Sequence, residues 1–277
     1  MHENREFSDT NKQVQVYYDQ SDTHNFYQKV SGGEHVHIGL FQHPNEDLEV
    51  AKKRTTEYMT SLLNIDDKCR ILDLGAGYGG TARYLAKTYS SRVSCLNISK
   101  MQNAINLQRN QEQELTSFID VQEGTFEQLP YSNSSFDVIW SQDAIYHSTT
   151  PEKVFQECSR VLGDEGELIF SVVMLDDSIS TENQQKLTQY YSLNLQYLQT
   201  YRHLAEEMNF CESKIVDFSE NIQINYSRLL EKMEVLQAEN NQLWSLDFYT
   251  KMKQRLLDWV DAGEKGLIHW KILHFQK

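Results

Sequence analysis

The 277-residue chain has few cysteines, no long apolar run and a shortage of positive charge. Its four cysteines are scattered without a C-x-x-C pair, so neither a disulfide framework nor a zinc site is expected, and the cysteines suit a reducing compartment. No apolar run approaches the ~20 residues of a transmembrane helix, and the first residues, Met1–Glu6, lack the apolar core of a signal peptide. We therefore expect a cytoplasmic protein with no membrane partner and no bound metal.

The 26 Lys and Arg residues are outnumbered by 40 Asp and Glu residues, which gives a formal net charge of −14. Such a balance repels polyanions, so no nucleic acid is expected as a partner or as a substrate. Hydrophobic residues make up 39% of the chain and aromatic residues 11%, which is enough for a packed core and excludes global disorder. The length fits one large domain or one domain with a lid.

The stretch that organises the chain is ILDLGAGYGGT at residues 71–81. An apolar strand leads into glycines, and a helical pattern follows at once. Glycines allow a sharp turn and let a ligand approach the bare backbone, while the following helix points its positive end at the turn. Gly75, Gly77 and Gly80 fit the G-x-G-x-x-G dinucleotide pattern, although a mere tight turn would also fit. The spacing predicts a nucleotide-type cofactor without identifying it.

Asp73, two residues before the first glycine, narrows the choice of cofactor. A carboxylate at the end of the strand would repel the pyrophosphate of a dinucleotide. It would attract the sulfonium and ammonium groups of S-adenosylmethionine. The residue therefore favours a methyltransferase over a dehydrogenase.

Strand and helix patterns alternate between residues 70 and 175, which predicts an α/β fold with a mostly parallel sheet. Strands are expected at 70–74, 92–96, 118–122, 136–141, 167–173, 212–218 and 267–275, and helices at 81–88, 99–114 and 151–162. The last strand is compatible with one antiparallel strand that completes the sheet. We expect a single domain over 1–277, made of a cap or lid (1–64), a cofactor-binding core (65–175), a helical insertion (176–209), and C-terminal strands and helices (210–277).

Two regions outside the core leave alternatives open. Before a helix expected at 46–63, an aromatic stretch covers residues 14–30, and residues 31–41 are irregular after a turn at their paired glycines. The polar-tipped rings of this region, such as Tyr17, Tyr18 and His35, serve either a lid or simple core packing. The strongly helical region 222–262 carries an apolar stripe. That stripe serves internal packing or a subunit interface, so a homo-oligomer is one expectation.

The order of elements and loops resembles that of the class I S-adenosylmethionine-dependent methyltransferases. The resemblance lies in DLGAGYGG at 73–80, GTFEQLP at 124–130 and FDVIWS at 136–141. It implies a Rossmann-like sheet of seven strands with an antiparallel last strand. It also implies that the cofactor contacts are Asp73, Gly75, Gly77, Asn97, Thr125, Phe126 and Gln142.

Asn97 departs from the pattern of this class. An acidic residue usually ends the second strand and binds the ribose hydroxyls, about 20 residues beyond the glycines. The amide of Asn97 can still accept a hydrogen bond through its carbonyl oxygen, but without a charge. Somewhat weaker cofactor binding follows.

A closer resemblance, over nearly the whole chain, is to the sarcosine/dimethylglycine N-methyltransferases that make glycine betaine. It is carried by Phe26 and Tyr27 with GGEHVHIGL at 32–40, by DAIYHS at 143–148, and by LIHW at 267–270 with the HF pair at 274–275. The resemblance implies a small-molecule amine substrate. It places Asp143 in the active-site loop.

The expected reaction is an in-line displacement in which an amine attacks the sulfonium methyl group. The amine needs a free lone pair, yet aliphatic amines are mostly protonated at neutral pH. His147 or His37 could take the proton. Tyr18, as part of the catalytic group, and Tyr27, as a substrate contact, could surround the cationic nitrogen.

The acceptor carboxylate needs a cation, and Arg202 beside Tyr201 in the inserted helices is the first candidate. A solvated arginine on a helix face is the alternative reading, and Lys29 is a weaker candidate. The acceptor could also be another small amine, phosphoethanolamine, or a sterol or quinone carbon. A non-catalytic module that binds S-adenosylmethionine is the alternative outside enzymes.

Overall fold

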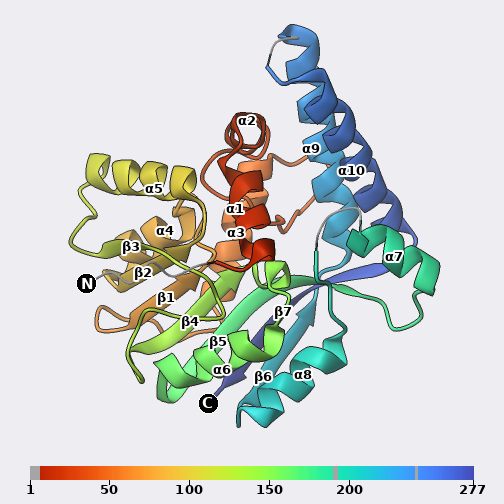
Figure 1. The fold of residues 1–277 in the computed structure, drawn as a ribbon. Helices are drawn as coiled ribbons and strands as arrows, with labels where there is room; N and C mark the ends of the chain where they lie inside the picture. Colours follow the sequence, from red (N-terminus) through yellow and green to blue (C-terminus); the bar gives the residue numbers. More distant parts are fainter. Residues whose placement is uncertain (1–6, 190–192, 241–242) are drawn as a thin grey trace.

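The computed structural model describes residues 7–189, 193–240 and 243–277, so Met1–Glu6 and a short part of the expected insertion lie outside it. The described chain forms a seven-stranded sheet in the order β3-β2-β1-β4-β5-β7-β6, with helices on both faces (Figure 1). The strands are β1 (Arg70–Leu74), β2 (Arg92–Asn97), β3 (Ile119–Glu123), β4 (Phe136–Gln142), β5 (Leu162–Leu175), β6 (Cys211–Asp217) and β7 (Ile268–Gln276). The expected Rossmann-like α/β fold is confirmed.

Strand β7 alone runs against its neighbours. It pairs antiparallel with β5, where Phe170 faces Leu273, and antiparallel with β6, where Ile215 faces the same leucine. The pairs β1–β2, β1–β4, β2–β3 and β4–β5 are parallel. Helices cover both faces of the central strands, so these strands are near-continuous apolar runs. The expectation of one antiparallel closing strand is confirmed.

The helices alternate with the strands in the core and extend it at both ends. They are α1 (Asp9–Asp19), α2 (Ser21–Lys29), α3 (Leu48–Thr60), α4 (Gly80–Tyr89), α5 (Lys100–Glu112), the short η1 (Ile145–His147), α6 (Pro151–Val161), α7 (Thr181–Gln189), α8 (Leu198–Glu207), α9 (Glu220–Glu239) and α10 (Leu246–Glu264). Local chemistry sets several of their ends. The Asp47 side chain accepts from the backbone of Glu49 at 2.8 Å and caps α3, and Pro151 opens α6.

Two local features differ from what the sequence predicted. Helices α1 and α2 were not predicted, and α1 has no buried residue, so no apolar periodicity indicates it; the stretch at 31–41 is irregular, as expected. Strand β5 begins before the strand expected at 167–173 and includes segment 163–166, where the register with β4 jumps between the pairs Phe136–Leu162 and Val138–Glu167. The two glycines there sit in an irregular part of a longer strand.

Helices α1 and α2 lie over the carboxyl ends of the parallel strands (Figure 1). The side chain of Gln15 donates to the Ile98 carbonyl at 2.8 Å, and the Ser99 hydroxyl donates to Asp19 at 2.6 Å. Helices α9 and α10 form a long hairpin beside them, and a shared apolar cluster joins Phe26 of α2 to residues of both helices. The stripe on α9 therefore packs inside the molecule, and a subunit interface stays a prediction.

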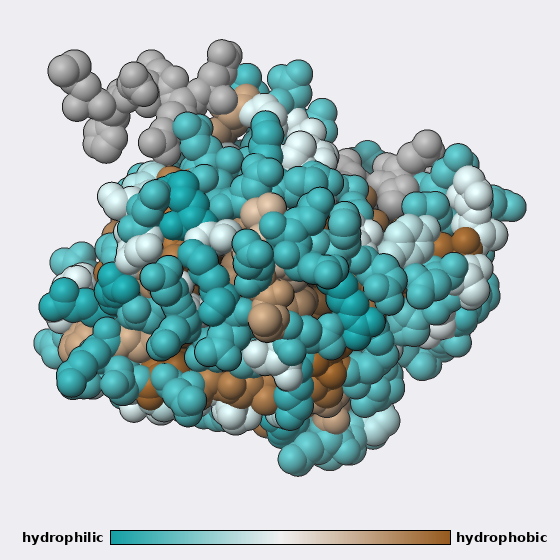
Figure 2. Space-filling model, turned by 90° about the horizontal axis from the view of Figure 1, so that it is seen from below, coloured by the Kyte–Doolittle hydropathy of each residue, from teal (hydrophilic) through white to brown (hydrophobic). Residues whose placement is uncertain are grey.

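The outer surface is mostly hydrophilic on the face turned toward the reader in Figure 2, where apolar residues form only narrow strips. Within the described ranges, no helix is long and apolar enough to cross a membrane.

Candidate active site

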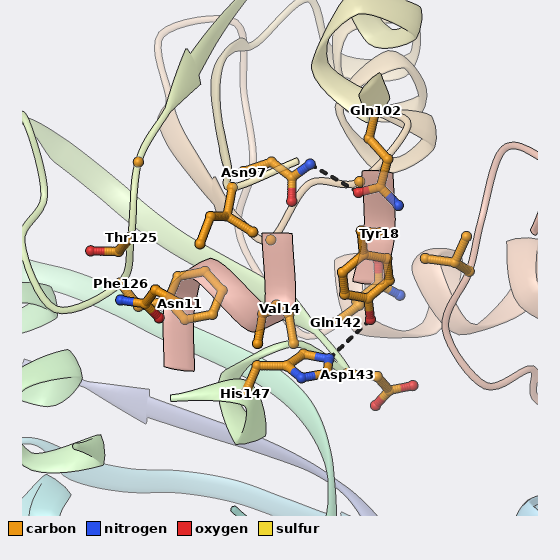
Figure 3. A pocket seen from close by; sticks show the side chains of 16 residues that line it. Asn11, Val14, Tyr18, Asn97, Gln102, Thr125, Phe126, Gln142, Asp143 and His147 are labelled. Atoms are coloured by element: carbon orange, nitrogen blue, oxygen red, sulfur yellow. Dashed lines mark hydrogen bonds between the residues drawn. The ribbon is translucent and has the colours of Figure 1, made fainter. Parts of the chain in front are cut away.

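Two cavities lie where the parallel strands end under α1 and α2. The first, the glycine-loop cavity, is lined by the loops after β1, β2, β3 and β4, and by α1 (Figure 3). The second, the tyrosine cavity, is lined by residues from α1, α2, the loop at 31–38, α9 and α10. Tyr18, Val36, Gln142, Asp143 and His147 line both cavities. The two cavities therefore meet at this shared wall.

The glycine loop needs its glycines for backbone conformation and for space. Gly75 has a φ of +79° and Gly77 a φ of +54°, values that residues with a side chain rarely adopt. A Cβ on Gly75 would lie 2.4 Å from the Cβ of Ala144. The bare backbone of this loop thus lines the first cavity, as the sequence predicted.

Asp73 lies at the end of β1, directly before this loop. Its side chain is buried, and one of its carboxylate oxygens has no hydrogen-bond partner among the described residues. Burial raises the pKa of this carboxyl to about 7. A buried acceptor without a partner is costly, and a cationic ligand such as an ammonium group would satisfy it. Asp73 therefore fits S-adenosylmethionine.

Asn97 and the pair Thr125–Phe126 stand on two other walls of the glycine-loop cavity (Figure 3). The side-chain amide nitrogen of Asn97 donates to Gln102 at 3.0 Å. This bond orients the amide so that its oxygen is the group left to accept from a ligand hydroxyl. The ring of Phe126 offers a flat apolar surface across the cavity. All of the predicted cofactor residues are thus brought to one place, with Asp73 just behind the loop.

The side chain of Gln142 is held in place by hydrogen bonds to other side chains. Its side-chain oxygen accepts from the Thr81 hydroxyl at 2.6 Å and from the Trp140 indole at 3.0 Å. Its side-chain nitrogen lies 3.4 Å from the Thr56 hydroxyl, so the side chain faces protein groups and the backbone is the candidate for a ligand contact.

Asp143 is held in the same way, at a φ of +49°. Its two oxygens accept from the backbone of Ile38, from the Ser171 hydroxyl and from the Trp270 indole, each at 2.8 Å. Burial raises the pKa of this carboxyl, and the three hydrogen bonds oppose the rise. Although Asp143 lines both cavities, its carboxylate is committed to joining three segments of the fold, which disfavours the predicted substrate contact.

His147 and Tyr18 form a pair on the wall between the cavities. The Tyr18 hydroxyl lies 2.9 Å from Nε2 of His147, as the dashed line in Figure 3 shows. Burial, and next the positive charge of Arg255, lower the pKa of His147 to about 3, so the imidazole is neutral at physiological pH. Burial raises the pKa of Tyr18, which keeps its phenol protonated. The phenol and the imidazole are therefore both neutral and share one hydrogen bond.

His37 also lines the tyrosine cavity, but both of its ring nitrogens face protein groups. Nδ1 lies 3.0 Å from the Ile38 carbonyl and Nε2 lies 3.3 Å from Nδ1 of His35. Burial lowers the pKa of His37 well below its ordinary value. His37 is therefore less suited to take a proton from a ligand than a histidine with an open nitrogen.

Aromatic rings dominate the tyrosine cavity. Tyr27 stacks on Tyr18 with ring centroids 5.8 Å apart. The other rings on its wall belong to Tyr17, Phe26, Tyr146, Tyr226 and Trp259. Ring faces attract quaternary and tertiary ammonium groups. A small cationic nitrogen is therefore the kind of group that suits this cavity.

The structure does not bring Tyr201 and Arg202 to either cavity. Tyr201 is buried between Phe155 and Phe170 in the core that α6 and α8 form with the sheet. Arg202 is partly exposed and pairs with Glu212 at 2.7 Å. The expectation that Arg202 binds the acceptor carboxylate is not supported, because α8 packs along the face of the sheet and not over the strand ends.

Arg255 of α10 is the cation that sequence reasoning missed. It lines the tyrosine cavity together with Met252, Leu256 and Trp259, which lie on the same face of the helix. A charged residue at this spacing within an otherwise apolar face was the signal that could have drawn attention to it. No group of three or more His, Cys, Asp or Glu side chains in the described ranges could hold a metal ion.

Comparison with known proteins agrees with this geometry. A family described as "Methyltransferase domain" matches residues 72–170. A sarcosine/dimethylglycine N-methyltransferase of Aphanothece halophytica is 38% identical over 96% of this chain and 97% of its own length. A glycine/sarcosine/dimethylglycine N-methyltransferase of Actinopolyspora halophila is also 38% identical, but the chain spans only 46% of that relative.

Among solved structures, a putative sarcosine dimethylglycine methyltransferase from Galdieria sulphuraria matches with a TM-score of 0.89. It is 34% identical, and the match covers 94% of this chain and 98% of that one. The similarity therefore extends well beyond the cofactor-binding core.

Proposed function

Because the chain belongs to the S-adenosylmethionine-dependent methyltransferases and is related to the glycine, sarcosine and dimethylglycine N-methyltransferases, we propose that it methylates sarcosine and dimethylglycine to glycine betaine. The observation that carries the proposal is the meeting of the two cavities at Tyr18 and His147. One cavity has the glycine loop of a cofactor site. The other has the aromatic wall that suits a methylated amine.

The glycine-loop cavity would hold S-adenosylmethionine, which supplies an electrophilic methyl group when bound. Asp73 would accept from the ammonium group, and the Asn97 side-chain oxygen from a ribose hydroxyl. Thr125 and Phe126 would flank the adenine, and the Gln142 backbone would contact the cofactor from the end of β4. All of these residues except Asp73 line the cavity, and the partnerless oxygen of Asp73 suits a cationic group.

The proton of the amine must leave before the attack. An aliphatic amine has a pKa near that of lysine, ~10, whereas the pKa of His147 is lowered to about 3. His147 would therefore be a much weaker base than the amine in solution, and proton transfer from the ammonium to His147 would be unfavourable. In this account the cavity takes up the neutral amine from solution, and His147 is not a general base.

His147 instead orients Tyr18. With the His147 proton on Nδ1, Nε2 would accept the phenol proton across their 2.9 Å contact, and the oxygen lone pairs of Tyr18 would be left for the amine side. This oxygen and the ring faces of Tyr18 and Tyr27 would stabilise the positive charge that grows on nitrogen. Much of the remaining acceleration would come from holding the nitrogen in line with the methyl group.

A mass-spectrometric methylation assay tests the proposal. The purified protein is incubated with S-adenosylmethionine and, separately, with glycine, sarcosine, dimethylglycine or phosphoethanolamine. We expect betaine from sarcosine and dimethylglycine, and little product from the other two. Binding of S-adenosylmethionine without product from sarcosine or dimethylglycine would contradict the proposed acceptors.

A further inference from the structure

We propose that Arg255 binds the carboxylate of the acceptor and so makes the tyrosine cavity selective for N-methylated amino acids over amines without a carboxylate. The inference rests on the proposed function, because it needs an amino-acid acceptor. It assigns the anchoring role to α10, and not to the inserted helices where the sequence suggested Arg202.

The position of Arg255 supports this role. The residue lies on the cavity-facing side of α10, between Met252 and Trp259. Its guanidinium carbon lies 5.5 Å from the centre of the Tyr17 ring, and one of its nitrogens donates to the Tyr17 hydroxyl at 3.1 Å. Tyr17 therefore helps to orient the guanidinium. Arginine presents its N–H donors in a planar fork, the geometry that matches the two oxygens of a carboxylate.

The electrostatics of the cavity point the same way. Among the described residues that line it, Arg255 is the one with a permanently positive side chain. The carboxylate of Asp143 is committed to three hydrogen bonds within the fold, and the imidazoles of His37 and His147 are neutral. Burial lowers the pKa of Arg255, but the surrounding tyrosines reverse this and leave the pKa raised. An incoming carboxylate therefore meets a charged guanidinium on a wall rich in aromatic rings.

The same cavity places the two ends of the acceptor. Arg255, Tyr18 and His147 all line the tyrosine cavity, so the cation and the Tyr18–His147 pair face the same volume. In sarcosine and dimethylglycine a single carbon separates the nitrogen from the carboxylate. With the carboxylate on Arg255, the nitrogen would lie toward the wall shared with the glycine-loop cavity, where the methyl group arrives.

The test measures kcat/KM for two acceptors in the wild type and in the variants Arg255→Ala, Arg255→Lys and Arg202→Ala. Dimethylglycine carries the carboxylate, and N,N-dimethylethanolamine has a similar size without it. We expect Arg255→Ala to raise the KM for dimethylglycine roughly 30-fold or more. We expect it to leave the weak activity toward N,N-dimethylethanolamine nearly unchanged, so the ratio of the two kcat/KM values collapses. Arg255→Lys should give an intermediate ratio, since it keeps the charge but loses the fork.

Arg202→Ala is the matched control, because Arg202 is the other arginine considered and pairs with Glu212 on the outer surface. It should change neither kcat/KM value. The affinity for S-adenosylmethionine, measured by calorimetry, shows whether each variant retains its fold, and Arg255→Lys decides the matter if Arg255→Ala does not fold. An unchanged ratio in a folded Arg255 variant would overturn the inference. A wild-type enzyme that makes no betaine would instead overturn the proposed function.

Discussion

At the residue scale, Asp73 shows how a binding group reduces the stability of the empty protein. Its carboxyl is buried, lacks a partner for one oxygen and has a pKa raised to about 7. The unfolded chain loses this proton at ordinary carboxyl pH values, whereas the folded chain holds it until about pH 7. Stability contributed by the protonated form is therefore lost as the pH rises from about 4 to about 7.

Asp73→Asn should separate stability from binding. Relative to the wild type, the unfolding free energy of this variant should rise by roughly 1–3 kcal/mol as the pH is raised from 4 to 8. Its affinity for S-adenosylmethionine should fall roughly 30-fold, because the ammonium loses a charged acceptor. Urea denaturation across this pH range and calorimetry measure the two effects. Asp120→Asn, at an exposed carboxylate of β3, is the control, and an equal pH dependence in both variants would contradict the assignment.

The Tyr18–His147 pair gives a second prediction at this scale. The logarithm of kcat/KM for dimethylglycine should rise with a slope near one from pH 6 to pH 9, as the neutral amine becomes available. His147→Gln should lower the rate roughly 10-fold without changing that slope, since His147 orients Tyr18. Tyr18→Phe should have a similar effect, and the double variant should be less impaired than the sum of the two. Loss of this pH dependence of kcat/KM in His147→Gln would contradict the prediction and would indicate that His147 is the general base.

Sequence reasoning was most successful where chemistry is local. Asp73 and the glycines are fixed by a strand, a turn and a helix that follow one another, so their place could be predicted from a short stretch. Arg202 and Arg255 could not be ranked in this way. Which arginine faces a cavity depends on how α8 and α10 pack, and that is decided by contacts far apart in the sequence.

At the element scale, the loop between α2 and α3 is held by buried polar groups from α3. The Lys52 ammonium is fully buried and donates to the carbonyls of Ser31 at 2.8 Å and His35 at 3.3 Å, and to the Ser31 hydroxyl. The Thr55 hydroxyl donates to the Ile38 carbonyl at 2.9 Å. Because this loop contributes Val36 to both cavities, α3 positions part of the site that it does not itself line.

Lys52 should make stability depend on pH. Burial, followed by the charge of Lys232, lowers its pKa to about 7. The unfolded chain keeps the proton up to about pH 10, so the wild type gains stability as the pH rises above 7. Relative to Lys52→Met, the gain should be about 1 kcal/mol per pH unit between pH 7 and pH 9.

Denaturation of Lys52→Met and Lys53→Met at several pH values measures this effect. Lys53 is the neighbouring lysine, with a side chain 60% exposed, so its replacement should leave the pH dependence of the wild type intact. Equal pH dependence in the wild type and in Lys52→Met would contradict the argument.

The elements themselves were predictable to different degrees. The strands and helices of the core were found from alternation, because a parallel sheet covered on both faces demands apolar runs separated by amphipathic helices. Helix α1 was not predicted, because its residues are half-buried or exposed and form no apolar face. Its conformation is supported by the Ser8 cap and by polar contacts to loops that lie distant in the sequence, such as that of Gln15 with Ile98.

At the scale of the whole molecule, the fold builds the two cavities by different routes. The glycine-loop cavity lies where β1, β2 and β4 end side by side, the usual place for ligands in open α/β sheets. The tyrosine cavity joins the two ends of the chain, since the contact between Tyr17 and Arg255 spans 238 positions. No local pattern reveals such a cavity, and therefore the cofactor could be predicted from the sequence more fully than the acceptor site.

The central claim is that cofactor and acceptor occupy separate cavities that meet at Tyr18 and His147. A crystal structure with S-adenosylhomocysteine and dimethylglycine tests it most directly. We predict the cofactor product along Gly75, Asn97 and Phe126, and dimethylglycine in the tyrosine cavity with its nitrogen toward Tyr18 and its carboxylate on Arg255. Dimethylglycine found outside the tyrosine cavity, or with its nitrogen turned away from the shared wall, would contradict the account.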